Sequence, residues 1–228
     1  MVTLLQDKWV HSDLKIGLDN SLVLNDFFDP GFAEAVESEL RNNIIYEEVD
    51  FGGVTRLRRG ERELGDAYFG ELINQEGKGS VHLGELMKLM QSQCFVDFLS
   101  GVFGEEIIFV RPGTPYLMGK GDKICLHDDL SDETHSCAVV FNFSKGWKRA
   151  YGGNTIVGNV KREEDIYTPP EVPFQLTKKV LYNNFKMHTP KFNSCLLIKI
   201  AQGLAHGVTQ IKADNERFSF VAIYSRNK

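Results

Sequence analysis

Apolar residues recur at helical spacing in two stretches of the first half of the chain. In the first stretch they return every four residues from Phe32 to Leu40. Asp29 and Pro30 stand just before it, where a carboxylate caps the first turn and proline loses no helical hydrogen bond. In the second, apolar positions from Leu83 to Leu99 keep helical spacing. We predict a strand at 22–24, a helix after it, and a second amphipathic helix of about four turns.

Between the two predicted helices, residues 51–79 are rich in glycine and charge and follow neither the helical nor the strand period. We expect a loop with short strands there. The arginine-rich run at 56–62 has the chemistry to meet an acidic group of a substrate. Because Glu61 and Glu63 interrupt it, a solvated face is the favoured interpretation.

After Gly101 the pattern changes to short runs of β-branched and aromatic residues separated by Gly, Pro and Asp. Such runs are typical of a sandwich or barrel. The strands that we expect lie at 107–110, 116–118, 123–127, 137–143, 154–157, 195–200, 207–211 and 218–224. Eight strands after two helices predict a mainly β fold with supporting helices, built on a double-stranded β-helix, that is, a cupin-like jelly roll. The interval 159–193 has no clean pattern and predicts a lid or substrate loop.

The length and composition favour one domain. A chain of 228 residues with 42% hydrophobic residues can bury one substantial core. We therefore expect a single domain over residues 1–228, with helical support up to about residue 105 and the jelly-roll core over about 106–226.

Net charge and cysteine content limit which partners and which cellular compartment we expect. The formal net charge of -5 offers no general attraction to nucleic acid or to anionic membranes, so we expect neither as a partner. The four cysteines form no CxxC pair, which favours a reducing cytoplasm over a disulfide framework or a zinc ribbon. No stretch approaches the roughly 20 apolar residues of a spanning helix, and we find no targeting signal.

The short motif His127-Asp128-Asp129 carries candidate metal chemistry. On an extended strand, His127 and Asp129 would point the same way. His206 lies at the later strand expected at 207–211, which could return beside the first and add a second imidazole. Two histidines and one carboxylate on one face of a metal form the facial triad of non-haem Fe(II) oxygenases, with positions left open for other ligands. The motif alone is weak, because a lone histidine is often structural.

A second motif strengthens the first. Arg217 and Ser219 lie two residues apart on a predicted strand, so both face one side. An arginine fork with a neighbouring hydroxyl suits a carboxylate. An anion clamp beside a metal implies a dicarboxylate ligand.

Taken in order, these motifs resemble the prolyl-hydroxylase-like branch of the Fe(II) and 2-oxoglutarate dioxygenases. The resemblance covers about residues 111–224. The matching residues are Tyr116, Gly121-Asp122, His127, Asp129, the strand 139–142, Trp147, Gly152-Gly153, Pro190, Asn193, His206, Val208, Arg217 and Ser219. Asn25-Asp26-Phe27-Phe28-Asp29 before a helix also looks like the usual entry to this branch.

The resemblance implies a set of ligands and residue roles. Fe(II) would be held by His127, Asp129 and His206, with 2-oxoglutarate and O2 as co-substrates. Arg217 and Ser219 would hold the far carboxylate of 2-oxoglutarate. Further co-substrate contacts are expected from Tyr116 and Asn142, and substrate contacts from His135 and Trp147. Two departures from the branch affect these contacts: Thr134-His135 stands where many members carry Arg, and Phe141-Asn142 replaces an aromatic pair containing Tyr.

The function that we expect is hydroxylation of an unactivated C-H bond of an amino acid, a small metabolite or a peptidyl side chain, with release of succinate and CO2. In the resembling enzymes, a carboxylate at the position of Asp129 accompanies hydroxylation, desaturation or cyclisation, whereas a small residue there accompanies chlorination. Two alternatives stay open. One is a jelly-roll metal-binding protein without turnover; the other is a nucleic-acid demethylase on the same core, which the acidic composition disfavours.

Overall fold

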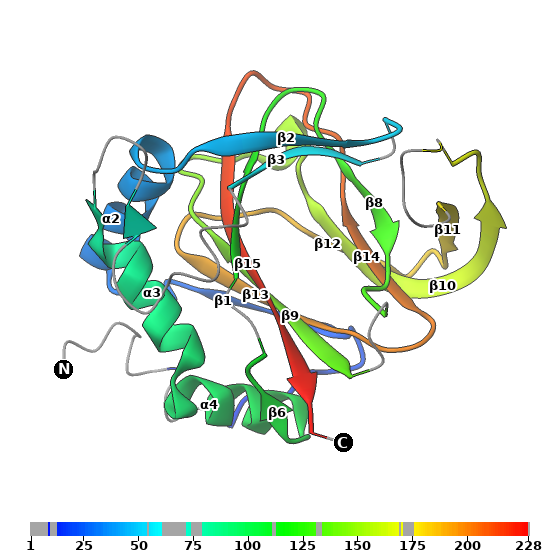
Figure 1. Cartoon of the computed structure of the whole chain (residues 1–228). Coiled ribbons are helices and arrows are strands. Elements are labelled where there is room, and N and C mark those ends of the chain that lie inside the picture. Colours follow the sequence, from blue (N-terminus) through cyan, green and yellow to red (C-terminus); the bar gives the residue numbers. More distant parts are fainter. Residues whose placement is uncertain are drawn as a thin grey trace.

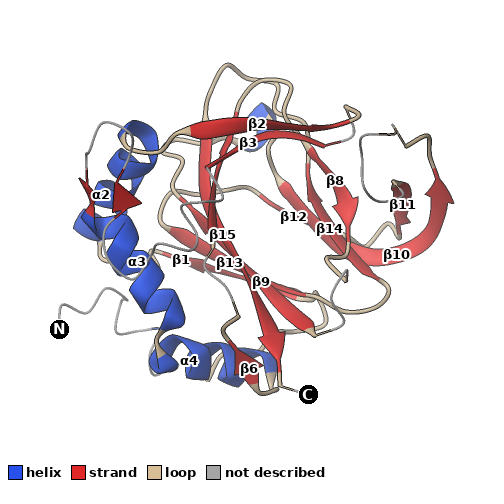
Figure 2. Ribbon diagram, in the orientation of Figure 1, coloured by secondary structure: helices blue, strands red, loops and turns tan. Residues whose placement is uncertain are grey.

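Two antiparallel sheets face each other, and helices cover the outer side of the larger sheet (Figures 1 and 2). The computed structural model describes residues 9, 13–53, 55–60, 72–73, 79–110, 113–130, 134–168, 170 and 176–227. The helices lie at the left of Figure 1, and the smaller sheet lies at the right. The fold is the predicted mainly β jelly roll with helical support.

The first predicted helix is confirmed as α2 (Pro30–Asn42). The Asp29 carboxylate accepts hydrogen bonds from the backbone N–H groups of Gly31 (2.9 Å) and Phe32 (3.2 Å), as a helix cap does. None of the described helices has both the length and the apolar character needed to cross a membrane.

The second predicted helix is wrong in one respect, because it is two helices. These are α3 (Val81–Gln91) and α4 (Gln93–Phe103). Ser92 separates them with an extended backbone (ψ 142°), and its hydroxyl accepts a hydrogen bond from the Phe95 N–H at 3.3 Å. A serine hydroxyl competes for backbone groups and caps a new helix more readily than it continues an old one.

The larger sheet has eight strands in the described part of the chain. Along its main path they are β1 (Ser21–Asn25), β13 (Ser194–Lys199), β9 (His135–Asn142), β15 (Arg217–Arg226), β7 (Thr114–Met118), β3 (Thr55–Gly60) and β2 (Tyr46–Phe51), with β6 (Ile107–Ile108) paired to β15. The sheet therefore draws strands from both sides of residue 105.

The smaller sheet has five strands, and a separate pair lies near the helices. The five are β11 (Thr177–Leu181), β10 (Thr155–Asp165), β14 (Leu204–Val208) and β8 (Ile124–His127), with β12 (Lys186–His188) paired to β10. The separate pair is β4 (Leu72–Ile73) with β5 (Gly79–Ser80). A short 3-10 turn spans Arg149–Tyr151.

Strand alternation on β15 divides the apolar core from the space between the sheets. Phe218, Phe220, Ala222 and Tyr224 are buried in the cluster that contains the helices. The alternate residues Arg217, Ser219, Val221 and Ile223 face the smaller sheet. Each large side chain buried on the helical side contributes about 1.5–3 kcal/mol. The helices thus fix the strand whose other face carries the polar groups.

Several element boundaries differ from the sequence prediction. Residues 159–193 are not a structureless insertion, because β10 continues to Asp165 and β11 and β12 follow. The strand expected at 207–211 is β14, which begins three residues earlier, at Leu204. The short strands expected within 51–79 are present as β3, β4 and β5. Residues 61–63, and with them part of the arginine-rich run, lie outside the described residues.

Candidate functional site

A cavity of about 580 Å³ lies between the two sheets. Its walls are mostly apolar, with Val140, Val221 and Ile198 contributed by the larger sheet. Two groups of polar side chains on these walls define the candidate site. One comes from β8, β14 and the turn after β8, and the other comes from β15. Mostly apolar walls with a few convergent polar groups are typical of a ligand site.

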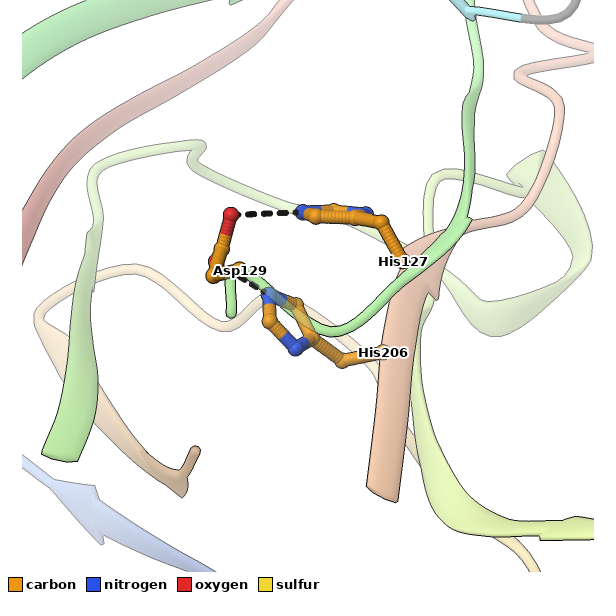
Figure 3. A group of neighbouring side chains, drawn as sticks. All are labelled: His127, Asp129 and His206. Carbon is orange, nitrogen blue, oxygen red and sulfur yellow. Dashed lines mark ion pairs between the residues drawn. The ribbon is translucent and has the colours of Figure 1, made fainter. Parts of the chain in front are cut away.

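The first polar group is the trio His127, Asp129 and His206. His127 ends β8 and pairs directly with His206 on β14, which brings the ring centroids to 4.4 Å. Nε2 of His127 lies 3.4 Å from Asp129 Oδ1, and Nε2 of His206 lies 3.1 Å from Asp129 Oδ2. Figure 3 shows both rings directed at this carboxylate. One ligand atom from each residue falls within 4.8 Å of the others, so the set can hold a metal ion.

The way in which His127 and Asp129 meet differs from the sequence argument. That argument placed both on one extended strand, but β8 ends at His127. Asp129 has a φ of 55°, in the left-handed region that aspartate tolerates better than most residues. A turn, and not strand alternation, brings its carboxylate back to the histidine.

Backbone carbonyls fix two of the rings around this turn. His127 Nδ1 donates to the Cys125 carbonyl at 2.8 Å, which leaves Nε2 facing the centre. His135 Nδ1 donates to the Asp129 carbonyl at 2.7 Å. His135 is absent from the cavity lining, so it contacts the backbone of a trio member from outside the cavity.

The trio is electrostatically coupled. Burial acts to raise the pKa of Asp129, but hydrogen bonds and charge from the two histidines hold that pKa far below its usual range. Burial acts to lower the pKa of His127, and the hydrogen bond and charge of Asp129 raise it overall. For His206, burial and the charge of His127 lower the pKa. An ionised carboxylate between two imidazoles, one of them kept neutral, presents lone pairs to a cation.

The second polar group centres on Arg217, which is only 2% exposed. Its Nη1 lies 3.3 Å from Met118 Sδ, and its Nη2 lies 3.4 Å from Asn142 Oδ1 and 3.5 Å from Thr155 Oγ1. Its Nε has no hydrogen-bond partner among the residues that the structure describes. Burial lowers the pKa of Arg217 to about 10, so the guanidinium remains charged at neutral pH.

No carboxylate forms an ion pair with Arg217 in the described part of the chain. A buried charge without a counterion is costly, and removing it from water is tolerated only where something else compensates it. The guanidinium faces the cavity that also contains the trio. An uncompensated guanidinium in this position favours binding of an anion in the cavity.

The other predicted residues divide between the cavity and the layer behind it. Ser219 and its cross-strand neighbour Tyr116 both line the cavity, beside Arg217. Asn142, the neighbour of Ser219 on β9, is not among the lining residues and touches Arg217 from the side.

Trp147 also lies outside the cavity lining. Its indole N–H donates to the Gly152 carbonyl at 2.9 Å, and the ring packs beside Ile211. A Cβ on Gly153, whose φ is 64°, would lie 2.9 Å from Trp147 and 3.4 Å from Arg217 Cδ. Trp147 and Gly153 thus pack behind the arginine stem, and a substrate contact by Trp147 or His135 stays a prediction.

Two cavity residues were missed by the sequence analysis. Lys179, on β11, is nearly buried and lines the cavity; its Nζ contacts Asp128 Oδ2 at 2.5 Å and Glu163 Oε1 at 2.9 Å. These ion pairs tie β11 to the turn that carries Asp129. Thr155 contacts Arg217 from β10. Lys179 lies in the interval where no strand pattern was recognised, so no periodicity could have placed it.

No protein-family model matches this sequence, and no curated protein sequence matches it. Solved structures do resemble the fold. A 2OG-Fe(II) oxygenase family oxidoreductase from Burkholderia pseudomallei aligns over 91% of this chain and 86% of its own, with 21% identity and a TM-score of 0.60.

Two further structures align over a similar length. A prolyl hydroxylase from Trichoplax adhaerens, in complex with a hypoxia inducible factor peptide fragment, covers 92% and 84% of the two chains, with 11% identity and a TM-score of 0.61. HygX from Streptomyces hygroscopicus, with nickel, 2-oxoglutarate and hygromycin B bound, covers 91% and 83%, with 16% identity and a TM-score of 0.57. At these identities the likeness establishes the fold: the chain has the jelly-roll fold of 2OG-Fe(II) oxygenases.

Proposed function

We propose that this protein is an oxygenase that uses Fe(II), 2-oxoglutarate and O2 to hydroxylate an unactivated C-H bond. The observation that carries the proposal is the buried, carboxylate-free charge of Arg217 in the same cavity as two imidazoles and a carboxylate. The substrate would be an amino acid, a small metabolite or a peptidyl side chain.

The donor set fits iron. His127, Asp129 and His206 offer two nitrogens and one oxygen from one side, which suits non-haem Fe(II) and leaves the opposite positions open. Arg217 would hold the far carboxylate of 2-oxoglutarate by charge-assisted hydrogen bonds, and Ser219 would add its hydroxyl. Tyr116, which pairs with Ser219 across the strands, would add a further contact.

Bound iron would use O2 as the oxidant and 2-oxoglutarate as the co-substrate, supplying an oxidation that no side chain can perform: one oxygen atom enters succinate, which is released with CO2, and the other enters the product. The protein itself would orient the metal ligands and exclude water from the cavity. His127 is aimed by the Cys125 carbonyl, and the backbone of Asp129 is held by His135. The apolar walls around Val140 and Val221 keep bulk water from the substrate.

The similar structures support the proposed ligands. HygX binds nickel and 2-oxoglutarate in its crystals, and the Trichoplax enzyme binds a peptide. Both a small molecule and a peptide are therefore compatible with this fold as substrates. Since the four cysteines are all free, we also propose a reducing compartment, the cytoplasm.

The direct test is addition of Fe(II) and then 2-oxoglutarate without O2. We expect a weak visible charge-transfer band from the chelate, and succinate once O2 is admitted. Absence of both at saturating iron would favour a metal-binding jelly roll without turnover. Tight DNA or RNA binding that weakens steeply with salt would favour the demethylase alternative.

His135 gives a further prediction, because it holds the Asp129 backbone. His135→Leu removes the donor, and we expect Fe(II) affinity to fall by about tenfold to a hundredfold, as for other partners of metal ligands. His135→Asn retains an N–H near the position of Nδ1 and should recover much of that affinity. Competition with a coloured chelator measures the Fe(II) affinity of both variants. Equal affinities in the Leu variant and the native protein would show that this hydrogen bond does not position the ligand.

A further inference from the structure

The three arginines of β3 do not share one environment. Arg56 and Arg58 face away from the cavity, and each has a carboxylate partner: Arg56 Nε lies 2.9 Å from Asp122 Oδ1, and Arg58 Nη2 lies 3.9 Å from Glu216 Oε1. Arg59 alternates to the other face and lines the cavity, as Thr55 and Leu57 do on the same strand. The expectation of a solvated face therefore fits Arg56 and Arg58 but not Arg59.

Arg59 is half-buried, and within the described residues it has no hydrogen bond and no ion pair. Glu47 is its direct neighbour on β2, yet the two side chains form no ion pair, and Glu47 is exposed. On β7, the direct neighbour of Arg59 is Tyr116, which in turn pairs with Ser219 on β15. Arg59 thus lies on the cavity face two strands away from Ser219, which is about 10 Å at ordinary strand spacing.

The other charges of the cavity lining would be compensated once iron and 2-oxoglutarate are bound. Lys179 pairs with Asp128. A ferrous ion, Asp129, Arg217 and a 2-oxoglutarate dianion would together carry no net charge. The guanidinium of Arg59 is then the one charge on the described cavity lining that nothing compensates. A partly desolvated positive charge at this place favours an anionic group in whatever fills the remaining space.

We infer that Arg59 binds a carboxylate of the substrate, and that the substrate is a small free acid, such as a free amino acid or organic acid. This inference rests on the proposed function and narrows it. The guanidinium fork suits the two oxygens of a carboxylate. The cavity of about 580 Å³ is within the range of small-molecule sites and accommodates 2-oxoglutarate with a small second molecule. A peptidyl side chain far from a chain end would bring no such group.

The test compares acids with their amides in the absence of turnover. The protein is loaded with Mn(II) and saturating 2-oxoglutarate without O2, and is titrated with free amino acids and small organic acids, each paired with its primary amide. Broadening of the probe's proton NMR signals by the bound Mn(II) reports binding. We expect at least one acid to bind about tenfold or more tightly than its amide, as for a hydrogen bond to a charged group.

Two variants test whether the preference for the acid over its amide depends on Arg59. In Arg59→Gln the acid and its amide should bind alike, whereas Arg58→Gln, on the outer face of the same strand, should keep the native preference. Equal binding of every acid and amide by the native protein, including no binding of either, overturns the inference, and so does a preference that survives in Arg59→Gln.

The Fe(II) and 2-oxoglutarate charge-transfer band separates this outcome from failure of the proposed function. Arg59→Gln should show the band at native intensity, because Arg59 lies apart from Arg217 and the trio. Loss of the acid preference with an intact band supports the role of Arg59. A native protein without the band overturns both the proposed function and the inference that rests on it.

Discussion

Asp129→Gly is expected to reduce succinate formation to the background of the assay. The variant removes one of the three proposed iron ligands. Losing a residue that only hydrogen-bonds to a metal ligand typically lowers metal affinity or activity by about tenfold to a hundredfold, and losing the ligand itself should lower both further. Glycine is chosen because Asp129 has a φ of 55°, a conformation that glycine adopts freely and that alanine adopts with strain. Coupled assays of succinate and 2-oxoglutarate measure the loss.

Asp129→Ala serves as the comparison. We expect it to be as inactive as Asp129→Gly and to be less stable than Asp129→Gly in thermal unfolding, by about 1–2 kcal/mol. If Asp129→Gly consumed 2-oxoglutarate at the native rate, Asp129 would have no place on the iron. If only the alanine variant were inactive, the defect would come from the backbone of the turn and not from the lost carboxylate.

Arg217→Met is expected to weaken 2-oxoglutarate binding by at least about a hundredfold without destabilising the fold. The reason is that removing one partner of a buried, hydrogen-bonded charge pair, here the guanidinium that would bind the 2-oxoglutarate carboxylate, weakens binding by about 2–5 kcal/mol. Methionine fills the space of the arginine stem beside Met118 without bringing a charge. Titration of the anaerobic Fe(II) protein with 2-oxoglutarate, followed through the charge-transfer band, gives the affinities.

The stability half of this prediction comes from the pKa of Arg217. Burial lowers that pKa from 12.5 to about 10, which corresponds to about 3 kcal/mol. Since the folded-state pKa is the lower one, the cost is fully present at neutral pH and disappears only as the pH rises through about 10 toward 12.5. The unliganded methionine variant should therefore melt at or above the native temperature.

Ligand linkage supplies the control for Arg217. At a hundredfold excess over its native dissociation constant, 2-oxoglutarate should stabilise the native Fe(II) protein by about 2.7 kcal/mol, and the same concentration should stabilise Arg217→Met by about 0.4 kcal/mol or less. A methionine variant that bound 2-oxoglutarate normally would place the co-substrate elsewhere. A variant that melted far below the native protein would show that Arg217 is structural.

The sequence predicted those features that depend on local periodicity. The α2 helix begins after Asp29 as expected, because the cap and the first turn are local in sequence. Arg217 and Ser219 face one side of β15 because alternation along a strand needs no knowledge of its neighbours. His206 also pairs with His127 as expected, although the register of β14 against β8 shifts directly beyond this pair.

Features set by long-range contacts were not predictable from the sequence. Tyr46–Phe51 is a strand because it pairs with β3, although its own pattern is largely charged. The left-handed turn at Asp129 leaves no periodic signal, so the pair His127 and Asp129 was predicted to meet for the wrong reason. Arg59 was grouped with its neighbours in a charged run, since nothing in the run reveals that its face closes the cavity.

The position of β15 has a consequence for biosynthesis. This strand runs between β9 and β7 in the middle of the larger sheet (red in Figure 1), yet both neighbours precede it by many residues. Until residue 226 has left the ribosome, the edges of β9 and β7 that face β15 have no partner, and unpaired edges invite association with other chains. The nascent chain would thus carry both histidines before it has the arginine, and its exposed edges would favour binding by chaperones.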